Sequence, residues 1–191
     1  MQVKIQFGLF KGKILRYPQD HKARPSLARA RDVLFNWLGN CDKMQCLDLF
    51  AGTGILGLEA LSLGATSIHF IDKELNHIQK LQQHIQKMKI DDRCEIFCTD
   101  SISWLEQNNQ LFDLVFLDPP FKQNWLEKIL SLHSFKKCLH NSSLIYLEAE
   151  RGWSLPLNWN LYKQKNLGDV SIYLVTPNQN TSNKHDNTDR I

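Results

Sequence analysis

Short apolar runs alternate with stretches of helical periodicity along most of the chain. The apolar runs predict five buried strands, at residues 46–50, 66–72, 93–98, 112–117 and 143–150. Helical spacing of apolar residues predicts helices at 26–38, with Ser26 as N-cap, from 55 to a stop at Gly64, and at 74–88, 101–107 and 125–139. Hairpins are expected over residues 1–17 and 159–175. This order predicts an α/β fold of the Rossmann-like kind, with a seven-stranded, mostly parallel sheet and helices on both faces.

The first predicted strand runs directly into a glycine-rich loop and a helix. Gly52, Gly54 and Gly57 fit a dinucleotide-binding fingerprint, which alone is a weak signal. Asp48, near the end of the strand, favours a different ligand, because a carboxylate repels a pyrophosphate and suits the sulfonium and ammonium groups of S-adenosylmethionine. An aspartate that merely caps the turn is the structural alternative.

Acidic residues follow three of the predicted strands, on the edge where an open α/β sheet binds ligands. These are Asp48, Asp72 and Asp100. With the glycine loop they indicate a cofactor site, in which Asp72 contacts the ribose hydroxyls and Asp100 lies near the adenine amino group. The other candidate cofactor-binding residues are their neighbours Phe50, Ala51, Gly52, Thr53, Gly54, Lys73 and Ser101.

The strand at residues 112–117 ends in Asp118-Pro119-Pro120-Phe121, the candidate catalytic residues. Two prolines stiffen the turn and remove backbone donors, which leaves the Pro119 carbonyl available to an outside group. Asp118 and that carbonyl can accept hydrogens from an exocyclic amine, while Phe121 can stack on its base. A rigid loop without chemistry is the alternative.

Charge is distributed unevenly along the chain. Residues 1–37 hold eight Lys or Arg and two Asp, a balance of 8 − 2 = +6, so that the rest carries 3 − 6 = −3 of the overall +3. A basic arm at residues 1–25 on a mildly acidic domain at 26–175 indicates a polyanionic partner, although a solvated charged face is the simpler reading. The candidate RNA-binding residues are Lys11, Lys13, Arg16, Arg24, Arg29 and Arg31.

The remaining composition is that of an ordinary globular protein, with 42% hydrophobic and 23% charged residues in 191. No apolar run approaches the roughly 18 residues of a membrane span, and the first residues do not read as a signal peptide, so a cytoplasmic location is expected. Five scattered cysteines without a C-x-x-C pair argue against a metal site. Residues 176–191 contain almost nothing apolar and are expected to be disordered.

Four stretches together resemble the bacterial RsmD family. They are residues 8–15, 24–38, 47–61 and 115–121. The stretch at 24–38 is the most specific of them, although Ser26 and Leu27 to Arg29 depart from the family's usual Thr and acid–arginine pair, and Asp72 from its usual Glu.

The resemblance implies a class I methyltransferase that uses S-adenosylmethionine to methylate N2 of a guanine in 16S rRNA, guanine 966 by the family's pattern. The implied substrate is the 30S subunit or a late assembly intermediate, and a monomer is expected. A DNA adenine-N6 methyltransferase, an NAD-dependent oxidoreductase and a non-catalytic RNA-binding protein are the alternatives.

Overall fold

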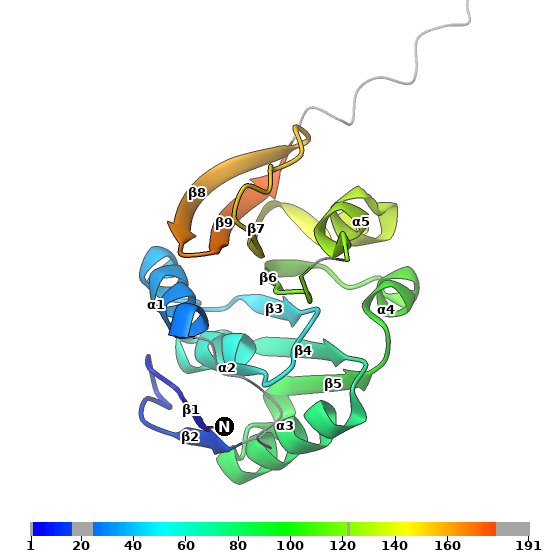
Figure 1. The fold of residues 1–191 in the computed structure, drawn as a ribbon. Helices are drawn as coiled ribbons and strands as arrows, with labels where there is room; N and C mark the ends of the chain where they lie inside the picture. The colour runs from blue at the N-terminus through cyan, green and yellow to red at the C-terminus, as the bar shows by residue number, and fades with distance from the viewer. Residues whose placement is uncertain (1, 17–24, 122, 179–191) are drawn as a thin grey trace, which may run out of the picture.

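A seven-stranded sheet forms the centre of the protein (Figure 1). The computed structural model describes residues 2–16, 25–121 and 123–178. The strands stand in the order β5-β4-β3-β6-β7-β9-β8; β9 pairs antiparallel with β7 and β8, and the other neighbouring pairs are parallel. Their bounds are β3 Gln45–Asp48, β4 Ser67–Asp72, β5 Cys94–Cys98, β6 Phe112–Leu117, β7 Leu139–Glu150, β8 Trp159–Leu167 and β9 Val170–Pro177. The predicted fold is therefore confirmed, including the final hairpin with its turn at Gly168.

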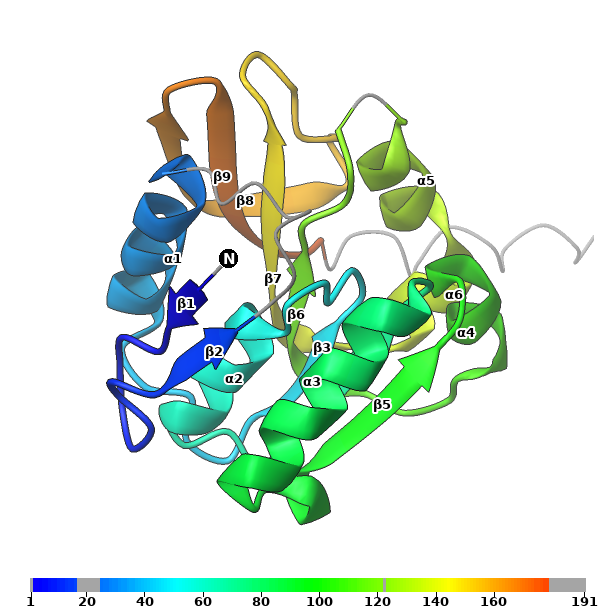
Figure 2. The same ribbon diagram turned by 60° about the horizontal axis from the view of Figure 1, so that its bottom comes forward.

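Helices cover both faces of this sheet, as Figure 2 shows. Side chains alternate along each strand, so that Cys46 and Phe116 belong to one apolar core while Leu47 and Val115 belong to the other. The first core is closed by α1 Pro25–Leu38, α2 Ile55–Ser62 and α3 Leu75–Met88. The second is closed by α4 Ser101–Gln107, α5 Trp125–Ser131 and α6 His133–Lys137.

The N-terminal segment forms the predicted hairpin, from β1 Gln2–Lys4 and β2 Ile14–Arg16. It is a separate two-stranded sheet that packs beside α2 (Figure 2). The backbone N–H groups of Gln6 and Phe7 donate to the Glu59 carboxylate at 2.8 and 3.0 Å. Gly8 has a left-handed φ of 67°, and an added Cβ would lie 1.8 Å from the Ser62 carbonyl oxygen, so only glycine allows this close contact.

Several predicted boundaries were wrong. The helix expected at 125–139 is broken, because Leu132 has extended backbone angles between α5 and α6, and Leu139 already begins β7. Helix α1 begins at Pro25 and not after Ser26, since a proline lacks the N–H that the first turn leaves unpaired. Arg93 ends a 3-10 turn, Asp91–Arg93, before β5.

The sheet also extends past the predicted end of the domain. Thr176 and Pro177 belong to β9, so the expected disorder does not begin at residue 176; residues 179–191 lie outside the described part of the chain. Among the described helices, none has the length and apolar character needed to cross a membrane.

Candidate active site

A cavity of about 510 Å³ opens at the carboxyl ends of the central strands. The strand order reverses there, between β3 and β6, which is where open α/β sheets bind ligands. Its lining residues are Leu49, Phe50, Gly52, Asp72, Lys73, Glu74, His77, Asp100, Ser101, Asp118, Pro119, Pro120, Phe121 and Trp125. The two motifs found in the sequence therefore meet in one cavity.

The glycine loop joins β3 to α2 and requires its glycines for two different reasons. Gly52 and Gly54 have left-handed φ angles of 50° and 70°. A Cβ on Gly54 would lie 2.5 Å from Leu81 Cδ1, and one on Gly57 would lie 2.4 Å from the Phe70 ring. Packing therefore requires glycine at positions 54 and 57, whereas Gly52 exposes backbone without a side chain at the cavity wall.

Asp72 holds this loop in place. Its Oδ2 accepts a hydrogen bond from the Gly52 N–H at 2.6 Å, and its Oδ1 accepts one from the Glu74 N–H at 2.8 Å. The His77 Nδ1 atom lies 3.3 Å from the same Oδ1. The predicted ribose-binding acid thus lines the cavity and also ties β4 to the glycine loop of β3.

Asp100 and Ser101 occupy the neighbouring wall. Asp100 caps α4, because its Oδ1 accepts from the N–H groups of Ile102 and Ser103 at 2.9 and 3.2 Å. The Ser101 hydroxyl donates to the Leu49 carbonyl at 2.6 Å. Both predicted residues line the cavity, and Asp100 also serves as the N-cap of α4.

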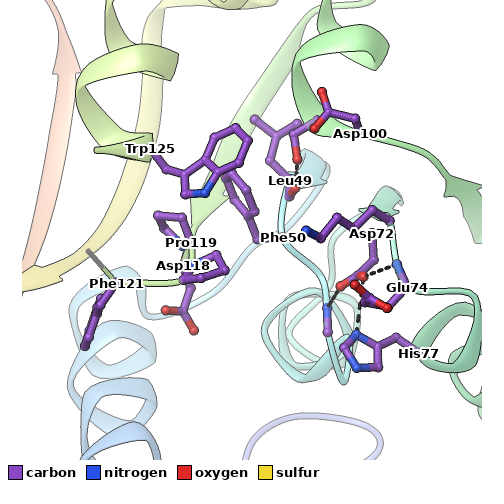
Figure 3. A pocket seen from close by; sticks show the side chains of 14 residues that line it. Leu49, Phe50, Asp72, Glu74, His77, Asp100, Asp118, Pro119, Phe121 and Trp125 are labelled. Carbon is purple, nitrogen blue, oxygen red and sulfur yellow. Dashed lines mark hydrogen bonds and ion pairs between the residues drawn. The ribbon is translucent and has the colours of Figure 1, made fainter. Parts of the chain in front are cut away.

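The Asp118–Phe121 segment forms the opposite wall, as Figure 3 shows. Asp118 follows the last residue of β6 and stands across the cavity from Asp72 and His77. Phe121 packs against the core formed by α1 to α3. The rings of Phe50 and Trp125, which also line the cavity, pack edge to face with their centroids 5.5 Å apart.

Asp48, the residue that favoured S-adenosylmethionine over a dinucleotide in the sequence analysis, does not line this cavity. Its side chain is only 2% exposed, and its Oδ1 has no hydrogen-bond partner among the described residues. Burial, and then the charges of Asp118 and Asp72, raises its pKa to about 8. Asp48 is therefore buried close to Asp118 and Asp72, and its contact with the ligand stays a prediction. Ala51, Thr53 and Gly54 shape the loop but are likewise absent from the lining.

The electrostatic balance of the cavity is negative. Among the described lining residues, four carboxyl groups, from Asp72, Glu74, Asp100 and Asp118, stand against the ammonium group of Lys73. Such a wall favours a ligand with positive charge and disfavours a pyrophosphate. The sequence analysis missed four lining residues, which are Leu49, Glu74, His77 and Trp125. Glu74 and His77 could have been predicted, because they follow the strand-terminal Asp72 closely in the sequence.

The basic candidates divide into two groups. Lys11, Lys13, Arg16 and Arg29 are exposed, and Arg24 lies outside the described residues. Arg31 is only 6% exposed: its Nε lies 3.3 Å from Glu59 Oε1 and donates to Gln6 Oε1 at 3.0 Å. Predicting Arg31 as an RNA contact was therefore wrong, because this guanidinium holds the N-terminal hairpin against α1 and α2.

No group of His, Cys, Asp and Glu within the described ranges is arranged to hold a metal ion.

Comparison with known proteins identifies the family of this chain. The family model described as "Conserved hypothetical protein 95" matches residues 3–176. The proteins named "Ribosomal RNA small subunit methyltransferase D" (RsmD) are 37% identical in Haemophilus influenzae, over 91% of this chain and 93% of that one, and 35% identical in Escherichia coli, over 91% and 89%. The chain belongs to the RsmD family.

Solved structures agree with this RsmD assignment. A protein of Escherichia coli assigned as a methyltransferase superposes with a TM-score of 0.82 at 33% identity, over 93% of this chain and 98% of that one. One of Haemophilus influenzae assigned as a methylase gives 0.79 at 37%, over 93% and 99%. The fold of this RsmD-family chain is therefore the class I methyltransferase fold, and the NAD-dependent alternative is set aside.

Proposed function

We propose that this RsmD-family chain transfers a methyl group from S-adenosylmethionine to the exocyclic N2 amine of a guanine in 16S rRNA, guanine 966 by the family's pattern. The observation that carries the proposal is the single cavity in which the glycine loop faces the Asp118–Phe121 segment. The relatives' name supports the rRNA substrate.

The residues of the donor wall fit S-adenosylmethionine. When bound, that molecule supplies a methyl group on a positively charged sulfur, and the acidic cavity suits such a ligand. Gly52 would offer backbone that no side chain shields, and Asp72 would accept hydrogens from the ribose hydroxyls. Asp100 and Ser101 would lie toward the adenine, and Phe50 supplies an apolar surface.

The acceptor wall would position and orient the amine. The Asp118 carboxylate and the Pro119 carbonyl accept the two amine hydrogens, which aims the nitrogen lone pair at the methyl donor. Neither Pro119 nor Pro120 has an N–H that could compete for these acceptors. Phe121 stacks on the base, so the guanine must leave its helix or lie in a loop. Asp118 does not need to be a strong base, because the amine becomes acidic as it gains the methyl group.

The surroundings of the reaction are part of the same proposal. We infer an assembled or nearly assembled 30S subunit in the cytoplasm as substrate, a monomeric enzyme without metal, and an arm at residues 1–25 that contacts RNA. The exposed side chains of Lys11, Lys13, Arg16 and Arg29 support the arm's role, because cations there can neutralise phosphates.

The test is methyl transfer from labelled S-adenosylmethionine to undermethylated small subunits, with free 16S rRNA and duplex DNA in parallel. The products are digested to nucleosides and separated. Label in N2-methylguanosine from the subunits is the expected result, at a position that sequencing then identifies. Label in N6-methyladenine from the DNA would instead support the DNA-methylating alternative, and label in none of the three would overturn the proposal.

A further inference from the structure

A second cavity of about 320 Å³ adjoins the candidate active site. The two share four residues, Pro119, Pro120, Phe121 and Trp125. Glu148, near the end of β7, lines the second cavity and not the first. Any base held by the Asp118–Phe121 segment would therefore have this second space beside it.

Glu148 is an unusual lining residue, because its side chain is buried yet incompletely paired. It is 2% exposed, and its Oε1 accepts a hydrogen bond from the Tyr146 hydroxyl at 2.6 Å. Its Oε2 has no hydrogen-bond partner among the residues that the structure describes. A buried oxygen without a partner destabilises the folded protein, so a ligand that brings a hydrogen to it recovers that free energy on binding.

The strand register brings Glu148 next to Asp118. In the parallel pair β6–β7, Phe116 lies opposite Tyr146 and Leu117 opposite Leu147. Continuing this register one residue past the end of β6 sets Asp118 beside Glu148. The Phe116 and Tyr146 rings are 6.4 Å apart and so lie on the same face, and residues two further along each strand return to that face. Burial first, and then the nearby Asp118, raises the pKa of Glu148, which agrees with this closeness. The carboxyl therefore accepts a hydrogen from a base only after it has given up its own proton.

We propose that Glu148 is the residue that selects guanine, by accepting the N1–H of the target base while Asp118 accepts a hydrogen of the N2 amine. This inference rests on the proposed function. Two acceptors side by side match two adjacent donors. Of the bases that carry an exocyclic amine, only guanine has a ring N–H beside it, whereas adenine N1 and cytosine N3 are acceptors. An acceptor facing either of those lone pairs would repel the base.

The test compares guanosine with 2-aminopurine riboside at the target position. Both carry the N2 amine, but 2-aminopurine has a lone pair at N1 where guanine has a hydrogen. Each is ligated into 16S rRNA that is then assembled into small subunits. Wild-type enzyme and Glu148→Gln are assayed on both, because the Gln amide can donate a hydrogen to the N1 lone pair of 2-aminopurine.

We expect Glu148→Gln to lower kcat/KM on guanosine by about 10- to 100-fold, the discrimination of one well-placed base contact. The value on 2-aminopurine should rise, because the Gln amide donates to N1 where the carboxylate repels it, so that the ratio between the bases falls at least about tenfold. An equal loss on both bases, or no loss on either, would overturn the inference. A wild-type enzyme that leaves guanosine unmethylated would contradict the proposed function itself.

Two further variants keep the test decisive. Glu106→Gln removes the same charge from an exposed position on α4 and should leave the ratio unchanged. If Glu148→Gln does not fold, Glu148→Asp withdraws the carboxylate by one methylene, and the ratio should again fall; an unchanged ratio contradicts the inference. Affinity for S-adenosylmethionine, measured by calorimetry, should stay within about 2-fold of wild type in every variant, since Glu148 lies outside the first cavity.

Discussion

The two walls of the active site use their carboxylates differently. On the donor wall, Asp72 and Asp100 accept hydrogen bonds from backbone N–H groups of their own chain. Near the acceptor wall, Glu148 is paired only to Tyr146 and keeps one oxygen without a partner among the described residues. The donor wall is thus ordered by the protein itself, while Glu148 beside the acceptor wall keeps one oxygen for a hydrogen that the substrate brings.

This difference suits an enzyme that binds the same methyl donor in every turnover but has to select one base among many. Every turnover uses the same donor, so a wall fixed in advance reduces the ordering cost of binding. The acceptor base has to be distinguished from other bases, and a site with unmet acceptors rejects any base that lacks the matching donors. Variants of the two walls should therefore fail in different ways.

The largest effect is expected from Asp118→Ala on the acceptor wall. Removing the carboxylate takes away an acceptor for the amine hydrogens, and kcat should fall by about a thousandfold or more. Donor affinity, measured by calorimetry, should remain within about 3-fold of wild type. Asp118→Asn keeps one acceptor oxygen and should retain intermediate activity. A large loss of donor affinity in Asp118→Ala would place Asp118 on the donor wall instead.

Asp72→Ala should produce the opposite pattern. Gly52 and Glu74 then lose the acceptor for their N–H groups, and the glycine loop loses its tie to β4. The Kd for S-adenosylmethionine should rise by about 10- to 100-fold, equivalent to roughly 1.4–2.8 kcal/mol, while kcat at saturating donor changes much less. The exposed Asp92 provides the matched control as Asp92→Ala. Equal losses in kcat and affinity would contradict the separation of the two walls.

Asp48 beneath the site should make stability depend on pH. Its pKa of about 8 in the folded protein exceeds the ordinary value, so the folded state keeps a proton that the unfolded chain loses. This contribution to stability therefore decreases as pH rises from about 4 to about 8. Asp48→Asn stays neutral, and its stability relative to wild type should increase by roughly 3–4 kcal/mol between pH 5 and pH 8. Denaturant unfolding at both values measures this; a constant difference would contradict it.

The smallest effect concerns the exposed arm, far from both walls in sequence. The double change Lys11→Ala and Lys13→Ala should weaken binding to small subunits by about tenfold and reduce the slope of log K against log salt by about two. Melting temperature and donor affinity should not change. Lys136→Ala with Lys137→Ala, also exposed, removes equal charge from α6 and should bind normally. Equal weakening by both pairs would mean that only net charge matters.

Much of this arrangement was predictable from local sequence. Strand-terminal acids, glycines and the Asp118–Phe121 segment depend on spacing along one chain, and Asp72, Asp100, Asp118 and Phe121 all face the cavity. The mostly parallel seven-stranded sheet with its final hairpin also followed from β/α alternation. Membership of the RsmD family confirms the fold that these patterns predicted.

The rest could not be predicted because it depends on contacts between distant segments. Arg31 reads as a surface base until the hairpin and α2 place Gln6 and Glu59 around it. Trp125 enters the cavity only because the chain turns back after β6. Apolar spacing continues through Leu132, so the break between α5 and α6 has no local signal.

The anchoring of the N-terminal hairpin on α2 fixes its distance from the active site. Glu59 and Ser62, which hold Gln6, Phe7 and Phe10, lie on α2, the helix that begins at the glycine loop. The span from the basic arm to Asp118 is therefore set by the folded domain and does not vary with a flexible tether. With the proposed RNA-binding role of the arm, this fixed span would select an RNA that is folded to the same spacing.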